Sequence, residues 1–223
     1  MANKTTGEAV TPFDPEPRWP AWIAVLAVGG LHTALPSYLM LGPRWLFLVV
    51  LLALLIPTVI SHAKKYHQLN RVVGFAVTGT ITLALIASVI LLIGALPAHK
   101  ETPIELLLSA GSLWFTNILV FALWYWRLDA GGPHGRDQRK GHSEGAFLFP
   151  QMTMPSQATS GADLEDWSPN FVDYLFLAFN TSTAFSPTDA PVLARWAKLL
   201  MMLQSLISLT VIALLAGRAV NIL

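Results

Sequence analysis

Five long apolar stretches restrict what this chain can fold into more than any other feature of its sequence. They cover residues 21–41, 44–61, 72–96, 104–126 and a C-terminal run that begins near Arg195. An α-helix rises about 1.5 Å per residue, so about 20 apolar residues cross the hydrocarbon core of a bilayer. Hydrophobic residues make up 54% of the 223 residues and charged residues only 12%, about half the share in soluble domains. We therefore expect an all-α, polytopic transmembrane helix bundle with five full spans.

Prolines and glycines divide these stretches. Pro36 lies inside the first stretch, where we expect it to kink the helix and to free a carbonyl group near His32, one turn earlier. Gly42 and Pro43 then break the chain. Pro57 is expected to kink the end of the second helix.

The polar segments divide the chain into four parts. Residues 1–20 are a proline-rich polar tail without a basic segment leading into an apolar core, so we expect no cleaved signal peptide. Residues 21–127 are a four-span membrane region, and residues 128–169 are a polar loop. Residues 170–223 hold a short pore-like helix, a turn and the last transmembrane helix.

The basic residues of the loops predict the orientation, since Lys and Arg accumulate in short cytoplasmic loops. They gather after the second and the fourth span, at Lys64, Lys65, Arg71, Arg127, Arg136, Arg139 and Lys140. Two spans separate these clusters, so both can face the cytoplasm. We expect a multi-pass protein of the plasma membrane whose N-terminus is also cytoplasmic.

The C-terminal part contains an apolar stretch that is too short to cross a bilayer comfortably. Residues 171–185 read FVDYLFLAFNTSTAF and span only about 22 Å as a helix. The stretch either re-enters the membrane and returns to the same side, or crosses as a short sixth helix. Arg195 and Lys198, at the start of the last span, favour a cytoplasmic turn and therefore re-entry.

Polar side chains gather at the end of this short helix and in the turn that follows. They are Asn180, Thr181, Ser182, Thr183, Ser186, Thr188 and Asp189. Pro187 prevents the helix from continuing, and the carbonyl and hydroxyl oxygens of non-helical backbone at membrane depth can replace the hydration shell of an ion. We predict a pore- or filter-like site here. The alternative is a surface turn capped by the Ser186 or Asp189 side chain.

Four further polar residues lie inside the apolar stretches. Gln204 and Ser208 share one face of the last span, where they either line a pore or bond neighbouring helices. Asn117, in the middle of the fourth span, is either a hydrogen-bonding contact between helices or part of a pathway. His32 is either a structural residue near the expected Pro36 kink or a proton-sensitive site.

Several chemistries are missing from the sequence. The chain has no cysteine, which excludes disulfides, cysteine-ligated metals and thiol nucleophiles. It contains no GxSxG, HExxH or P-loop motif, and its six histidines do not cluster as metal ligands. We therefore expect no enzymatic activity, no cofactor and no metal. The formal net charge of +1 gives no indication of a nucleic-acid partner.

Three segments of the second half resemble a known family. FVDYLFLAFNTSTAFSPTDAP and the apolar helix after it, together with FALWYWRLDAGGP and FLFP further upstream, resemble the C-terminal part of the bacterial membrane family called domain of unknown function 1345. The resemblance covers most of the second half of the chain. It implies an integral protein of the bacterial inner membrane and indicates little about substrate.

The filter-like region also distantly resembles the pore helix and filter of two-helix potassium channels, whose filter has the form TxGYGD. Thr183 and Asp189 match the ends of that pattern, but both glycines are missing and Ser186 and Pro187 occupy the middle. Glycine supplies the positive φ that aims successive carbonyl groups at an ion. The missing glycines therefore argue against potassium selectivity by that mechanism.

Two functions are compatible with these features. The first is a channel-like membrane protein that conducts a small ion or solute and assembles as a homo-oligomer in the lipid bilayer. The second is a scaffold or accessory subunit that transports nothing. A channel needs a water-accessible route past residues 180–189, whereas a scaffold buries those hydroxyl groups against other helices.

Overall fold

The structure is a computed structural model that describes residues 16–63, 66–95, 102–139, 141–142, 144–153, 167–183 and 190–220. Among these residues the only β-type pairing is an isolated bridge between Phe147 and Val192, and helices account for most of the rest. The expected all-α class is therefore confirmed for the described chain.

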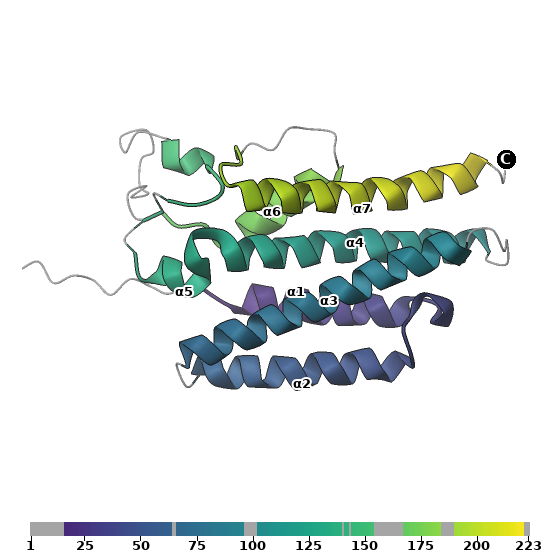
Figure 1. Ribbon diagram of the computed structural model, residues 1–223, viewed down its shortest axis with the longest axis horizontal. Helices are drawn as coiled ribbons and strands as arrows, with labels where there is room; N and C mark the ends of the chain where they lie inside the picture. Colours follow the sequence, from purple (N-terminus) through teal and green to yellow (C-terminus); the bar gives the residue numbers. More distant parts are fainter. Residues whose placement is uncertain are drawn as a thin grey trace, which may run out of the picture.

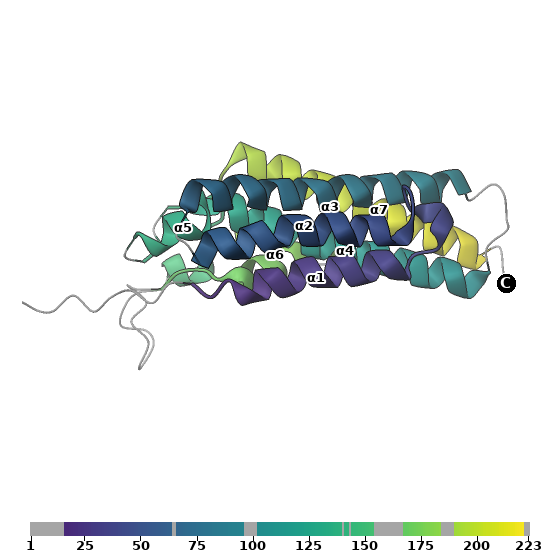
Figure 2. The same ribbon diagram turned by 90° about the horizontal axis from the view of Figure 1, so that it is seen from below.

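The longer helices lie side by side along the long axis of the molecule (Figures 1 and 2). They are α1 (Trp19–Ala34), α2 (Arg44–Ala63), α3 (His67–Ala95), α4 (Pro103–Leu128), α6 (Phe171–Thr183) and α7 (Arg195–Val220). The connections contain the short helix α5 (Gly132–Asp137) and three 3-10 turns, Ser37–Leu39, Asp129–Gly131 and Pro150–Thr153. The end of α2, helix α5 and the starts of α1, α3 and α7 lie at the same end of the bundle, which we call the loop end.

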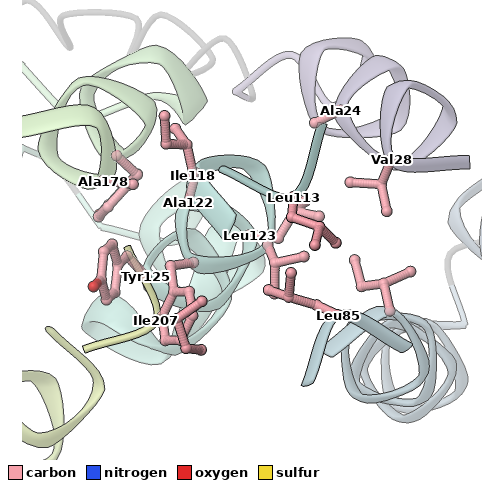
Figure 3. Close-up of a cluster of buried hydrophobic side chains, with 14 of the residues drawn as sticks. Ala24, Val28, Leu85, Leu113, Ile118, Ala122, Leu123, Tyr125, Ala178 and Ile207 are labelled. Carbon is pink, nitrogen blue, oxygen red and sulfur yellow. The ribbon is translucent and has the colours of Figure 1, made fainter. Parts of the chain in front are cut away.

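Helix α4 is the centre of the bundle, because it packs against α1, α3, α6 and α7. Its start is well defined by a capping box, in which Thr102 and Glu105 exchange side chain–backbone hydrogen bonds ahead of the first turn. Figure 3 shows side chains of α4 meeting Val28 of α1, Leu85 of α3 and Ile207 of α7 in one buried cluster. The fold therefore depends on packing around α4.

Three helices in the described chain are long and apolar enough to cross a membrane. Their apolar parts are Gln68–Ala95, Ile104–Asp137 and Arg195–Gly217, and two shorter apolar helices cover Trp19–Ala34 and Arg44–Ile60. Large apolar side chains point outward, and Leu83, Leu199 and Leu209 are 71%, 66% and 63% exposed. Soluble proteins rarely expose such extended apolar surfaces, whereas a lipid environment favours them. The structure thus supports membrane spans, although five full spans are not confirmed.

The first helix ends earlier than the sequence predicted. We expected a span over residues 21–41 with a kink at Pro36, but α1 ends at Ala34. Leu35 is extended, with a ψ of 146°, because the residue before a proline is forced away from helical geometry. Pro36 therefore terminates α1, and the 16 residues of the helix span only about 24 Å.

Candidate functional site

Helix α6 enters the bundle from the loop end and stops halfway. Its contacts with α7 pair Ala178 with Gln204 and Ser182 with Ser208, so the two helices run parallel. Parallel neighbours that follow each other in the chain both start at the same end, as Figure 1 shows. The last turn of α6 lies beside Asn117, near the middle of α4. The short apolar helix therefore begins at the same end of the bundle as α7, and its last turn reaches the middle of α4.

The start of α6 is fixed by its own side chains. Asn170 accepts a hydrogen bond from the backbone N–H of Val172 at 2.8 Å, and Asp173 accepts one from the N–H of Asn170 at 2.7 Å. Together they satisfy two of the donors that a helix start leaves unpaired. The Asp173 carboxylate in the first turn also complements the helix dipole.

Gln204 joins the three central helices through its side-chain amide. Its Nε2 donates to the Ala178 carbonyl of α6 at 2.6 Å and to Ser182 Oγ at 2.7 Å. Its Oε1 accepts from the Tyr125 hydroxyl of α4 at 2.5 Å. Because Gln204 is 0% exposed, these bonds replace water as its partners.

Serines of α7 satisfy the last carbonyl groups of α6. Ser208 Oγ donates to the Ser182 carbonyl at 2.5 Å and accepts from Trp114 Nε1 at 2.9 Å, while Ser205 Oγ donates to the Thr181 carbonyl at 3.3 Å. The last carbonyls of a helix have no partner within the helix. Here the neighbouring helix α7 supplies the partner, and these bonds hold the end of α6 in place.

Asn117 completes this group of side chains from α4. Its Nδ2 donates to the Gln204 carbonyl at 3.1 Å and to Ser182 Oγ at 3.4 Å, whereas its buried Oδ1 has no partner in the described chain. We call Asn117, Tyr125, Ser182, Gln204 and Ser208 the central network. All five are at most 2% exposed. These five side chains are therefore shielded from solvent, and their bonds join α4, α6 and α7 to each other.

The other predicted site residues are distributed differently. Thr181 and Thr183 bond to carbonyl groups of their own helix, and Asn180 faces a small cavity on another side of α6. His32 packs against Phe47 of α2, with ring centroids 4.0 Å apart. The structure thus brings together Asn117, Ser182, Gln204 and Ser208. Ser186, Thr188 and Asp189 lie outside the described residues.

A second group of polar residues, at the loop end, was not predicted from the sequence. Asp129 is fully buried, and its Oδ2 accepts a hydrogen bond from the Tyr174 hydroxyl of α6 at 2.6 Å, while its Oδ1 accepts one from the Ala146 N–H at 2.5 Å. His142 Nε2 lies 3.5 Å from Oδ2 and has no hydrogen-bond partner in the described chain. Burial lowers the pKa of His142, and the nearby Arg136 and Arg139 add to this although Asp129 opposes it.

Arg136 connects this group to the residues before α1. Its guanidinium donates to the Trp126 and Asp129 carbonyls at 2.9 and 3.1 Å and to Glu16 Oε2 at 2.9 Å. Arg18 pairs with Glu16 and with Asp137. We call Glu16, Arg18, Asp129, Arg136, Asp137, His142 and Tyr174 the end cluster. Residues 16–18 are therefore bonded to the end of the bundle, although the sequence placed them in a tail.

Arg127, in the last turn of α4, contacts α3 through its side chain. Its Nε donates to Thr78 Oγ1 at 3.0 Å, and its guanidinium occupies the space in front of Gly74. A Cβ atom at Gly74 would lie 1.9 Å from the nearer guanidinium nitrogen. The glycine therefore gives room for the half-buried guanidinium group of Arg127 between α3 and α4.

Comparisons with known proteins add no relative to this description, since no protein-family model, curated protein or solved structure matches the chain. The described chain is instead characterised by its fold, an all-helical bundle in which three helices are long and apolar enough to span a membrane and one helix is half as long. The resemblances drawn from the sequence stay predictions.

Proposed function

We propose that this chain is a channel-like integral membrane protein that conducts a small ion or solute. In this proposal α1, α2, α3, α4 and α7 are five membrane crossings, with α1 and α2 short enough to require local thinning or tilting of neighbouring helices. The N-terminus is cytoplasmic in the inner membrane. The loop end holds the basic segments around Arg71 and Arg139, which supports one cytoplasmic face.

The observation that carries this proposal is the half-length helix α6. A helix that ends at mid-depth places the polar groups of its last turn in the membrane interior, where they are stable only if protein or water surrounds them. Transport proteins use such interrupted helices, because helix ends and unpaired backbone groups provide sites for ions. Asn180 to Thr183 lie at this inner end, with Asn180 on a face that the central network does not use.

The position of the conducting path in this proposal is inferred from the polar side chains of α6 and α7 that already form hydrogen bonds between helices. The central network uses the side chains of Ser182, Gln204 and Ser208 for contacts between helices. A conducting path therefore runs on the Asn180 side of α6, and in this proposal a second copy of the chain contributes the opposite wall. This makes the functional unit a homo-oligomer in the bilayer.

The central network itself favours a second candidate, a scaffold or accessory subunit that transports nothing. Its five side chains are buried, and nearly all of their polar atoms are bonded within one chain. Polar residues in membrane helices often serve only to hold helices together, at about 0.6 kcal/mol for an average hydrogen bond. In that case α6 only packs against α4 and α7 and stabilises the bundle.

Ion flux into proteoliposomes separates the two candidates. Purified protein is reconstituted, and potassium, sodium, chloride and proton movement are compared with those of empty vesicles. We expect flux that falls at least tenfold in Asn180→Leu and is unchanged in Phe179→Leu, a neighbouring site that faces an apolar groove. Wild-type vesicles as tight as empty ones to all four ions would overturn the channel proposal and leave the scaffold.

A further inference from the structure

A cavity of about 120 Å³ lies along one face of α6. Asp173, Leu177 and Asn180 line it from the helix, while Phe149 and Gln151 close it from the connection after α5. Successive residues of a helix are turned by about 100°, so this face lies nearly opposite Ala178 and Ser182, which bond to α7. The cavity is therefore separate from the central network.

Polar groups are distributed along the whole length of this cavity. Asp173 and Asn180 are seven residues apart, so they are separated by about 10 Å along the axis of α6. Gln151 contributes a buried Oε1 atom that has no hydrogen-bond partner in the described chain. The cavity is thus a slot that runs from near the loop end to the inner end of α6.

Water is the expected content of such a slot. A buried carbonyl oxygen without a partner costs about 1–3 kcal/mol, which a bound water molecule offsets. A water molecule takes about 30 Å³ in the liquid, so there is room for about four. The neighbouring groove on α6 differs: it measures about 600 Å³, and only apolar residues such as Leu175 and Phe179 line it. None of its lining side chains offers a polar group that could hold a water molecule.

We infer that the slot is a hydrated entry for a small cation, which reaches Asn180 from the loop end past Asp173 and Gln151. Asp173 uses one oxygen to cap α6, and a carboxylate can accept about four hydrogen bonds, so capacity remains for an ion or its water. The other polar groups offer amide oxygens, which suit hard cations. No Lys, Arg or His lines the slot in the described chain, so its charge favours cations over anions.

This inference deepens the proposed function and rests on it only for the claim that the slot leads to a conducting path. Access and charge preference can be measured without flux, because the chain contains no cysteine and a single introduced thiol has no background. A negative result for the hydrated entry can therefore be distinguished from a negative result for ion conduction.

The test places cysteine at Asn180 and, as a matched control, at Phe179, in reconstituted full-length protein. The probes are the silver ion, a small cation that binds thiols, and dicyanoaurate, a small thiol-reactive anion. Thiols left unmodified are counted with a maleimide after denaturation. We expect silver to modify Asn180→Cys at least tenfold faster than dicyanoaurate does, and at least tenfold faster than it modifies Phe179→Cys.

Two further variants make the result decisive. Adding Asp173→Asn to Asn180→Cys is expected to lower the silver-to-dicyanoaurate ratio at least threefold. Gln151→Cys serves as a second reporter in case Asn180→Cys does not fold. Silver modification as slow at residues 180 and 151 as at residue 179 would show that the slot is dry, and equal rates for both probes would show that it does not select cations. Either result overturns the inference, whatever the flux experiment gives.

Discussion

The central network and the end cluster solve the same problem, burial of polar groups, in different ways. The central network lies at mid-depth and contains only neutral amides and hydroxyls, bonded to each other and to backbone carbonyls. The end cluster lies at the loop end and contains three carboxylates and two guanidinium groups. An ion is far more costly to remove from water than an amide. The charged groups therefore lie where the bundle ends, and hydrogen bonds between neutral groups hold α6 against α4 and α7.

This difference predicts that the largest loss of stability comes from the end cluster. Arg136→Met keeps most of the side-chain volume but leaves the Trp126 and Asp129 carbonyls and part of the Glu16 carboxylate without a donor. Removing one partner of a buried ion pair costs about 3–5 kcal/mol. We expect a loss of that size in the free energy of unfolding, measured by circular dichroism in detergent micelles.

The matched control for this variant is Arg139→Met, at an exposed position three residues further along. It should change the free energy of unfolding by less than about 0.5 kcal/mol. If both variants are equally stable, the ion pairs of the end cluster do not hold the N-terminal segment to the bundle, and the contrast between the two groups is lost.

A smaller loss is expected in the central network. Gln204→Leu leaves the Tyr125 hydroxyl without its acceptor and the Ala178 carbonyl without its side-chain donor. Each unpaired buried group costs about 1–3 kcal/mol, and membrane hydrogen bonds lie at the lower end, so we expect about 2 kcal/mol. Thr210→Val, at a half-buried residue whose hydroxyl group bonds to the Leu206 carbonyl of its own helix, should have almost no effect. A larger effect of Gln204→Leu than of Arg136→Met would reverse the comparison.

The contact between α3 and α4 predicts a loss of about 1 kcal/mol. In Gly74→Ala the new methyl group displaces the Arg127 guanidinium, whose bond to Thr78 is then broken. Gly79→Ala is the control, because a Cβ atom there meets no other atom within 4 Å. In an Arg127→Ala background the Gly74→Ala change should cost nothing, and thermal unfolding of the four proteins gives the coupling. Equal costs in both backgrounds would show that the contact is unimportant.

The central network could be predicted in part from the sequence. Asn117, Gln204 and Ser208 stand out because amides and hydroxyls are unusual inside apolar stretches, and their role as contacts between helices was one of two readings. Their contacts with Ser182 could not be predicted, because these contacts depend on how far α6 extends along α4 and α7. The capping pattern of Asn170 and Asp173, by contrast, was a local signal that could have been found.

The end cluster and the end of α1 could not be predicted from local sequence patterns. Glu16 and Arg136 are 120 residues apart in the chain, and each lies in a segment that looks like a solvated tail or loop. No local pattern connects them. Pro36 was a visible signal, but a proline ends or kinks a helix depending on whether packing beyond it continues. Here Ser88 Oγ bonds to the Leu39 carbonyl at 2.7 Å and fixes the turn that follows.

The smallest expected effect is the pH dependence of the end cluster. The pKa of His142 is lowered in the folded state by burial, so the unfolded chain, with a histidine pKa of about 6.5, binds the proton more readily. Stability is therefore constant above about pH 6.5 and falls as the pH decreases from there towards the folded-state pKa. Unfolding midpoints between about pH 7.5 and 5.5 should show this fall in the wild type and a flatter curve in His142→Gln. The carboxylates outside the end cluster contribute equally to both curves, so the difference between the curves reports His142 together with its contact to Asp129. If wild type and His142→Gln lose stability in parallel, protonation of His142 does not oppose the fold, and the end cluster tolerates a third positive charge beside Arg136 and Arg139.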